Sequence, residues 1–378
     1  MQLQALSMVS KVSMAPRGGA RGGRRRGVLA RAALRSVNGT RPLVESEAGR
    51  RALKHTWPGF VDWRRAEPRR DVVWGAGKKS TTEPTPGSSS SSSTSSSCFT
   101  ENHDEDEDDK LDSLTLAECG KLVLETSDPK EKALLTHQAY LRFAASREGE
   151  VGVARGPEEP GRPALPKLVP PRDCPGPKQS GLSLSAYMIH NLAHIELNAV
   201  DLAWDTVVSF SSNGDLPREF FVDFLRVADD ESRHLRWCLQ RLKELGAEYG
   251  DLPSHGLLWS AGAATRHDLL ARLVAIPMVQ EARGLDAGPR LVQRLRGSGD
   301  ARSAAIVEKI AEEERAHVAV GVFWFRYLCD GMTCEEVARE FHRIAEEHCG
   351  EMIRGPFETE TREAVGLLEQ WFAPVSAR

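Results

Sequence analysis

The segments Ala228-Asp-Asp-Glu-Ser-Arg-His234 and Ala311-Glu-Glu-Glu-Arg-Ala-His317 decide the fold of this 378-residue chain. Each segment contains the pattern Glu-x-x-His, and a single Glu lies on the helix expected before each copy. The repeated order of Glu followed by Glu-x-x-His is the set with which a four-helix bundle holds two metal ions. Six side chains are therefore candidate metal ligands: Glu196, Glu231, His234, Glu281, Glu314 and His317.

The spacing of the four carboxylates favours two helical hairpins. Glu196 lies 35 residues before Glu231, and Glu281 lies 33 residues before Glu314. The 50 positions from Glu231 to Glu281 leave room for the longer crossover that joins two hairpins in such bundles. We therefore interpret the chain as an internal repeat of two hairpins.

The helix face that each Glu occupies is a stronger argument than the motif, because a Glu–His pair at this spacing is often only a surface contact. With about 100° of rotation per residue, Glu196 shares its face with Leu192, Val200 and Val207. Apolar residues dominate the same face around the other three Glu, without Lys or Arg. A buried carboxylate normally becomes neutral, pairs or binds a metal. The pattern favours a metal; the alternative is that some of these Glu are protonated or reach solvent at the bundle ends.

The predicted fold class is all-α, a four-helix bundle with additional N- and C-terminal helices and no strand. The core bundle spans about 182–330, with helices expected at 182–210, 217–246, 267–286 and 300–329. Gly246 ends the second helix and Gly288-Pro289 ends the third. Two helices broken at Asp128-Pro129 precede the core, the Pro-rich segment 156–177 should be irregular, and helices at 334–349 and 361–372 follow.

The N-terminal third has a different composition. Its first 44 residues contain eight Arg and no Asp or Glu, which is typical of a mitochondrial or chloroplast transit peptide. The alternative is a disordered basic arm that binds nucleic acid or has no binding partner. Residues 81–110 are Ser-rich and then acidic, and cannot bury enough apolar surface to fold. We therefore predict a transit peptide and disordered arm at 1–80, a disordered linker at 81–110 and a helical domain at 111–378, in a soluble protein of the chloroplast or mitochondrion.

Several other classes of protein fit the composition poorly. Seven Cys occur without a Cys-x-x-Cys pair, which argues against a zinc ribbon or an iron–sulfur site. Cys238 lies one turn beyond His234 and could approach the ligands, although a buried Cys needs no such role. The sequence contains no run of eighteen apolar residues, so no transmembrane segment is predicted. The net charge of −4 gives no argument for nucleic-acid binding.

The ligand types indicate the chemistry. Carboxylates with one imidazole per ion suit two iron ions better than structural zinc, and manganese or a mixed pair fits the same ligands. We expect Glu231 and Glu314 to bridge the ions, leaving open positions for water, dioxygen or substrate. The sequence assigns no separate catalytic residue. Some neighbours could orient the imidazoles, although such residues more often form a solvated face: Asp229, Asp230, Arg233, Glu312, Glu313 and Arg315.

Five segments carry a resemblance to a known family. They are Ala193-His-Ile-Glu-Leu-Asn-Ala199, Asp229-Asp-Glu-Ser-Arg-His234, Glu281-Ala-Arg-Gly-Leu-Asp286, Glu314-Arg-Ala-His317 and Arg354-Gly-Pro-Phe357. Together they resemble the family known as domain of unknown function 455, within the ferritin-like di-iron carboxylate superfamily, from about Leu111 to the C-terminus. The resemblance implies a ferritin-like four-helix bundle with the same six ligands, but no particular substrate.

The resulting hypothesis is a soluble non-haem di-iron oxidase or monooxygenase. Its expected partners are dioxygen, a small-molecule or lipid-like substrate, an electron donor and a second copy in a homodimer. One alternative is an iron-binding or storage protein of the ferritin type. The other is a metal-free helical scaffold or interaction module, in which the Glu and His residues are relics of a former site or form salt bridges.

Overall fold

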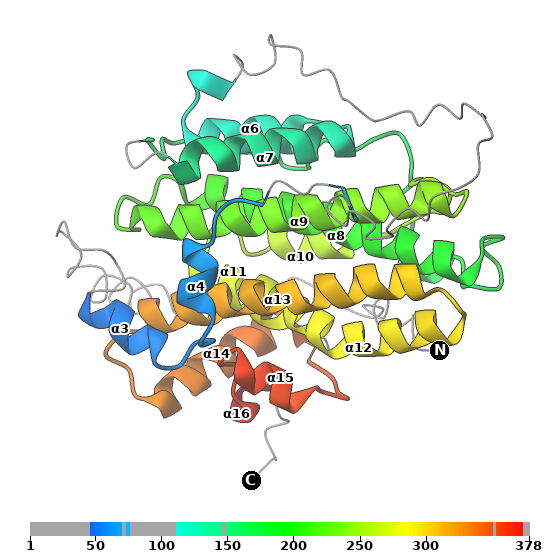
Figure 1. Cartoon of the computed structure of the whole chain (residues 1–378). Helices are drawn as coiled ribbons and strands as arrows, with labels where there is room; N and C mark the ends of the chain where they lie inside the picture. Colours follow the sequence, from blue (N-terminus) through cyan, green and yellow to red (C-terminus); the bar gives the residue numbers. More distant parts are fainter. Residues whose placement is uncertain (1–45, 70–72, 76–110, 146–148, 351–352, 373–378) are drawn as a thin grey trace, which may run out of the picture.

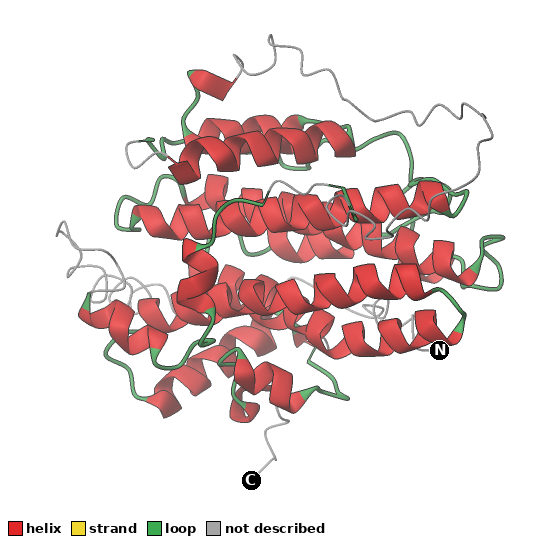
Figure 2. Cartoon of the chain, in the orientation of Figure 1, coloured by secondary structure: helices red, strands yellow, loops and turns green. Residues whose placement is uncertain are grey.

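The computed structural model describes residues 46–69, 73–75, 111–145, 149–350 and 353–372. Within these ranges the regular secondary structure is helical and no strand occurs (Figure 2). The predicted all-α fold class is therefore confirmed. The Arg-rich first 44 residues and the linker predicted at 81–110 lie outside the described residues.

Four long helical rods form the centre of the molecule (Figure 1). α8 (Leu184–Phe210) packs along α9 (Arg218–Glu244). α13 (Ala301–Leu328) packs along a rod made of α11 (Leu269–Leu273), η3 (Val274–Glu281) and α12 (Ala282–Gly297). Contacts between α9 and α13 join the two pairs. The predicted bounds of α8, α9 and α13 are within two residues of the observed ones.

Local sequence explains where these rods begin and end. Ser183 and Asp300 accept hydrogen bonds from backbone N–H groups in the first turns of α8 and α13. Such caps satisfy donors that the helix itself leaves unpaired. Gly246 follows α9 with φ +72°, a conformation that a residue without a Cβ adopts at little cost.

The third rod continues past Gly288-Pro289, so the helix end predicted there was wrong. α12 runs through Pro289 to Gly297, although an internal Pro costs a helix about 3 kcal/mol. The helical turns after Pro289 place three apolar side chains in the core. Leu291, Val292 and Leu295 are 8%, 5% and 0% exposed. Each such side chain contributes about 1.5–3 kcal/mol on burial. Tertiary packing therefore outweighs the local cost of the Pro.

Shorter helices cover both sides of the four rods. α6 (Leu116–Glu125) and α7 (Pro129–Ala145) pack against α8 and α9, with the predicted break before Pro129. α10 (Leu257–Ala263), which was not predicted, lies in the crossover between the two pairs. α14 (Cys334–His348), α15 (Thr359–Ala364) and α16 (Glu369–Phe372) cover the third rod, so the helix expected at 361–372 is two short ones.

The polar face of α8 is also buried. The Pro-rich segment before α8 has one short 3₁₀ turn, Pro171–Asp173, and is otherwise irregular, as predicted. From this segment Arg162 Nη2 lies 2.8 Å from Asp201 Oδ2, and the fully buried Lys132 pairs with the same carboxylate. Buried charges are tolerated when they are paired in this way. α8 is therefore enclosed on both faces.

Two further helices lie within the stretch that was predicted to be a disordered arm. They are α3 (Glu47–Leu53) and α4 (Phe60–Arg65), and both contact α13. The ring of Phe60 is fully buried and lies 5.0 Å from that of Phe323. A disordered arm therefore does not extend over residues 46–69. Helices of seven and six residues are too short to show a hydrophobic period in the sequence.

Candidate metal centre

The six predicted ligands come together in the middle of the four rods. Glu196 lies on α8, while Glu281 is the last residue of η3. α9 and α13 each supply one Glu-x-x-His motif. The ligand atoms form two sets, each within 4.8 Å, which share Glu314: Glu196, Glu231, His234 and Glu314, and then Glu281, Glu314 and His317.

Glu231 and Glu314 lie between the two imidazoles. Glu231 Oε1 is 2.8 Å from His317 Nδ1, and its Oε2 is 3.4 Å from His234 Nδ1. Glu314 presents its two oxygens to the same two nitrogens, at 3.5 Å for His234 and 3.3 Å for His317. Each of these two carboxylates therefore presents one oxygen to each imidazole.

The burial and hydrogen bonding of the donor atoms indicate whether they are suited to bind a cation. Glu231, His234 and His317 are at most 1% exposed. Nδ1 of both imidazoles, both oxygens of Glu231 and Oε2 of Glu281 are buried and make no hydrogen bond of good geometry, although each imidazole nitrogen lies within 3.5 Å of carboxylate oxygens. Unsatisfied buried polar atoms are strongly unfavourable. Because these atoms all belong to the cluster, a pair of bound metal ions fits this donor set.

The electrostatics of the cluster lead to the same conclusion. Burial, together with neighbouring carboxylates, raises the pKa of Glu196 and Glu281 well above the usual range. Burial alone would lower the pKa of His234 and His317, but the surrounding carboxylates raise it well above 6.5. Burial opposes ionisation of Glu231 too, yet the two imidazoles bring its pKa below the usual value. The cluster therefore holds positive charge strongly, whether as protons or as metal ions.

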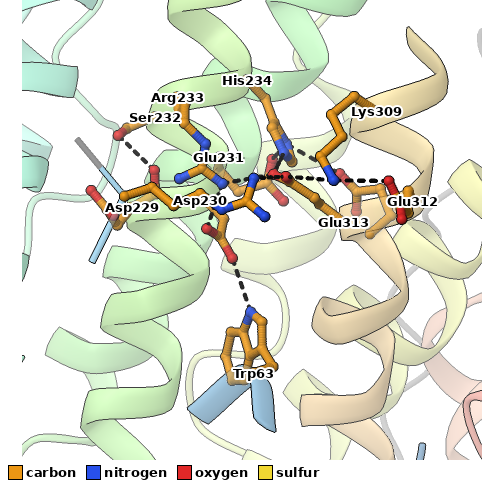
Figure 3. A network of polar contacts seen from close by, with 12 residues as sticks. Trp63, Asp229, Asp230, Glu231, Ser232, Arg233, His234, Lys309, Glu312 and Glu313 are labelled. Carbon is orange, nitrogen blue, oxygen red and sulfur yellow. Dashed lines mark hydrogen bonds and ion pairs between the residues drawn. The ribbon is translucent and has the colours of Figure 1, made fainter. Parts of the chain in front are cut away.

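A second layer of charged groups orients the imidazoles (Figure 3). His234 Nε2 lies 3.0 Å from Glu313 Oε2, and His317 Nε2 lies 3.4 Å from Asp230 Oδ2. Arg233 Nη2 donates to Asp230 Oδ1 at 2.7 Å and to Glu313 Oε2 at 2.6 Å. Such contacts direct Nδ1 of each ring towards the cluster. The acid that precedes each motif Glu thus holds the His of the other motif.

The remaining acidic and basic neighbours behave differently. Asp229 Oδ1 lies 2.7 Å from His137 Nδ1, away from the cluster. Glu312 is exposed and pairs with Lys309, and Arg315 is exposed. Cys238 is fully buried, and burial raises the pKa of its thiol well above the usual value. Sequence reasoning did not separate Asp230, Arg233 and Glu313 from these residues.

Glu281 is positioned by an unusual helical segment. η3 is π-helical and contains Pro277, whose nitrogen has no hydrogen to donate. π-helical turns within α-helices occur frequently at functional sites. Across from this segment, a Cβ on Gly321 would lie 2.6 Å from Pro277 Cγ. The absence of a side chain at Gly321 therefore lets α13 approach the ring of Pro277.

Comparison with known proteins places the chain in a family. The sequence model of the family described as "Protein of unknown function (DUF455)" matches residues 125–373. The chain belongs to this family. An uncharacterized protein of Haemophilus influenzae is 31% identical to it over 268 residues, which cover 65% of this chain and 88% of that protein. No solved structure matches the chain.

All six candidate ligands of this DUF455 chain lie within the matched residues, as do Asp230, Arg233 and Glu313. Two groups that contact these acids lie outside the match, namely Trp63 and Arg69. Sequence reasoning missed both, because no local pattern links Trp63 to Asp230 across 167 positions.

Proposed function

We propose that this chain is a ferritin-like protein that binds two iron ions and uses dioxygen to oxidise or hydroxylate a small or lipid-like molecule. The observation that supports the proposal is the set of buried Glu and His ligand atoms, arranged as two groups that each lie within 4.8 Å and share Glu314. Manganese, or one ion of each kind, would suit the same donors. Two bound iron(II) ions would supply electrons for the reduction of dioxygen.

Each ligand has a role in this proposal. Glu196, Glu231 and His234 would hold one ion, and Glu281, Glu314 and His317 would hold the other. Glu231 and Glu314 would bridge them. The outer acids Asp230 and Glu313 would keep the imidazoles oriented, and Arg233 would balance their charge.

The η3 side of the cluster is the proposed route for dioxygen and substrate. Glu281 and Gly284 are half-buried, whereas Glu196, Glu231 and both imidazoles are buried. A Cβ built on Gly284 would lie 3.9 Å from Glu314 Cγ, which is an ordinary contact, so Gly284 lies directly beside that carboxylate. A small molecule entering there would reach the Glu281 half first.

The described helices include none that is long and apolar enough to cross a bilayer. We propose the chloroplast or mitochondrion as the compartment, on the Arg-rich composition of the first 44 residues alone.

The proposal is tested with the full chain. After treatment with a chelator, the protein is loaded with Fe²⁺ under argon, bound metal is measured by elemental mass spectrometry, and dioxygen uptake is followed on exposure to air. We expect about two ions per chain, as di-metal bundles bind, and dioxygen uptake that depends on the bound iron. A folded protein that takes up neither iron nor manganese would overturn the proposal. Many iron atoms per chain without an oxidised substrate would favour storage instead.

A further inference from the structure

We propose that the segment from Ser46 to Arg69, here called the N-terminal strap, forms part of the metal centre by holding the two acids that orient His234 and His317. The strap lies outside the residues matched by the family model. This inference rests on the metal-binding function proposed above.

The two orienting acids have matching surroundings. Asp230 and Glu313 each contact Nε2 of one imidazole, and each accepts a hydrogen bond from Arg233. Each acid also has a partner from the strap. Trp63 Nε1 donates to Asp230 Oδ2 at 3.0 Å, and the Arg69 guanidinium pairs with Glu313 Oε1. The strap therefore completes the shell around both acids, and Figure 3 shows Trp63 below Asp230.

The Trp63 contact is the more important of the two. Asp230 is 8% exposed, and a hydrogen bond to a buried carboxylate is worth more than one in water. The Arg69 side chain is 45% exposed, so solvent screens its pairing with Glu313. Lys309 Nζ also lies 3.5 Å from Glu313 Oε1 and would partly replace Arg69.

The strap is anchored by contacts that do not involve these acids. Arg64 Nε donates to Asp223 Oδ1 at 2.8 Å, and Phe60 is fully buried against α13. Arg226 Nη1 donates to the carbonyl oxygens of Arg64 and Ala66 at 3.2 and 3.0 Å. In Figure 1 α4 crosses from α13 towards α9. Replacing Trp63 by Phe should therefore remove one hydrogen bond while the strap stays in place.

Trp63 is thus a positioning residue, and Co²⁺ is a suitable probe because its visible absorption reports the geometry of its ligands. The full chain and the variants Trp63→Phe, Arg69→Gln and Arg69→Lys are titrated with Co²⁺ after chelator treatment. We expect Trp63→Phe to weaken binding measurably, by less than the about 10–100-fold that follows loss of a direct partner of a ligand, and to shift the absorption bands. Arg69→Gln should have a smaller effect, and Arg69→Lys should restore most of it.

Two variants within the strap serve as matched controls. Trp57 packs against the core, and Arg51 pairs with Asp330 at the far end of α13. Trp57→Phe and Arg51→Gln should bind Co²⁺ as the unchanged chain does. If Trp63→Phe bound Co²⁺ with the same affinity and absorption spectrum as these two controls, the inference about the strap would be wrong, while the proposed metal binding would still be supported. If the unchanged chain bound no Co²⁺, both proposals would fall.

A second measurement needs no variant. If the strap stabilises the metal-binding arrangement, metal binding must stabilise the strap to the same extent. Hydrogen exchange of the backbone amides at residues 60–66 should therefore slow when Co²⁺ is added to the unchanged chain. The inference would be overturned if Co²⁺ left the exchange rates of residues 60–66 unchanged while it protected the amides around Glu231.

Discussion

Glu313, the residue before one motif, holds His234 of the other: Glu313 Oε2 lies 3.0 Å from His234 Nε2, while His234 Nδ1 faces Glu231 Oε2 at 3.4 Å. Asp230 and His317 repeat this relationship in the opposite direction, at 3.4 Å. The two Glu-x-x-His motifs are therefore interlocked, and each helix orients the ligand of its partner. The consequence is that each imidazole depends on an acid from the other helix for its orientation.

Removal of Glu231 should abolish binding of both ions, because its two oxygens face both imidazoles. In Glu231→Ala, Fe²⁺ or Mn²⁺ should no longer raise the melting temperature, whereas ligand at about 100 times its Kd stabilises a binding-competent protein by about 2.7 kcal/mol. Differential scanning calorimetry with and without metal makes the comparison. Glu312→Ala, at an exposed position on the side of α13 opposite Glu314, is the control. Full metal occupancy in Glu231→Ala would show that the ligand assignment is wrong.

Neutralising Glu313 should weaken, but not abolish, metal binding. Glu313→Gln removes the charge that faces His234 Nε2 and Arg233, and we expect a loss in affinity of about 10–100-fold. The loss should fall mainly on the ion held by His234, which a two-site titration resolves. Equal weakening at both sites would instead point to a general disturbance of α13.

Adding one methyl group at Gly321 should disturb the position of Glu281. The Cβ would lie 2.6 and 2.7 Å from two atoms of the rigid Pro277 ring, and overpacking of this kind typically costs about 1–3 kcal/mol. Urea unfolding of Gly321→Ala measures that loss, and metal titration should show weaker binding beside His317. Gly297→Ala is the control, because a Cβ there meets no atom within 4 Å. If both variants kept full stability, the close contact at Pro277 would be unimportant.

The bundle should lose stability in acid through two histidines that are not ligands. Burial lowers the pKa of His190 to about 4 and that of His194 to about 3. His190 Nε2 accepts the N–H of Gly250 at 3.0 Å, which requires an unprotonated nitrogen. Because the folded pKa values lie below about 6.5, the unfolded value, this stability is fully present above pH 6.5. It decreases as the pH falls towards 4 and then 3.

Urea unfolding of the chelator-treated protein tests this expectation. The free energy of unfolding is measured between about pH 7 and pH 4.5, because this is the range in which a histidine of the unfolded chain gains its proton. His194→Gln should show a shallower decline than the unchanged chain. His267→Gln, at an exposed position, should follow the unchanged chain. If the free energy of unfolding decreased with falling pH equally in all three proteins, His190 and His194 would not be the cause of the loss of stability in acid.

The sequence by itself predicted the six candidate ligands and most of the bundle. Helical periodicity is local, so the apolar face around Glu196 and the spacing from Glu231 to His234 were readable without a structure, as were the bounds of α8, α9 and α13. The order of ligands along the chain follows from two hairpins, and it led to two groups that the structure places together.

Only the tertiary structure decided which neighbours serve the cluster. Asp229 and Asp230 are adjacent in sequence, yet one contacts His137 and the other His317, because the packing of α7 and α13 selects the partner. The passage of α12 through Pro289 likewise depends on burial of the side chains beyond it. The contact of Trp63 with Asp230 spans 167 positions. Such contacts arise from the packing of segments that are distant in sequence, and this packing produces no periodic pattern in the sequence of either segment.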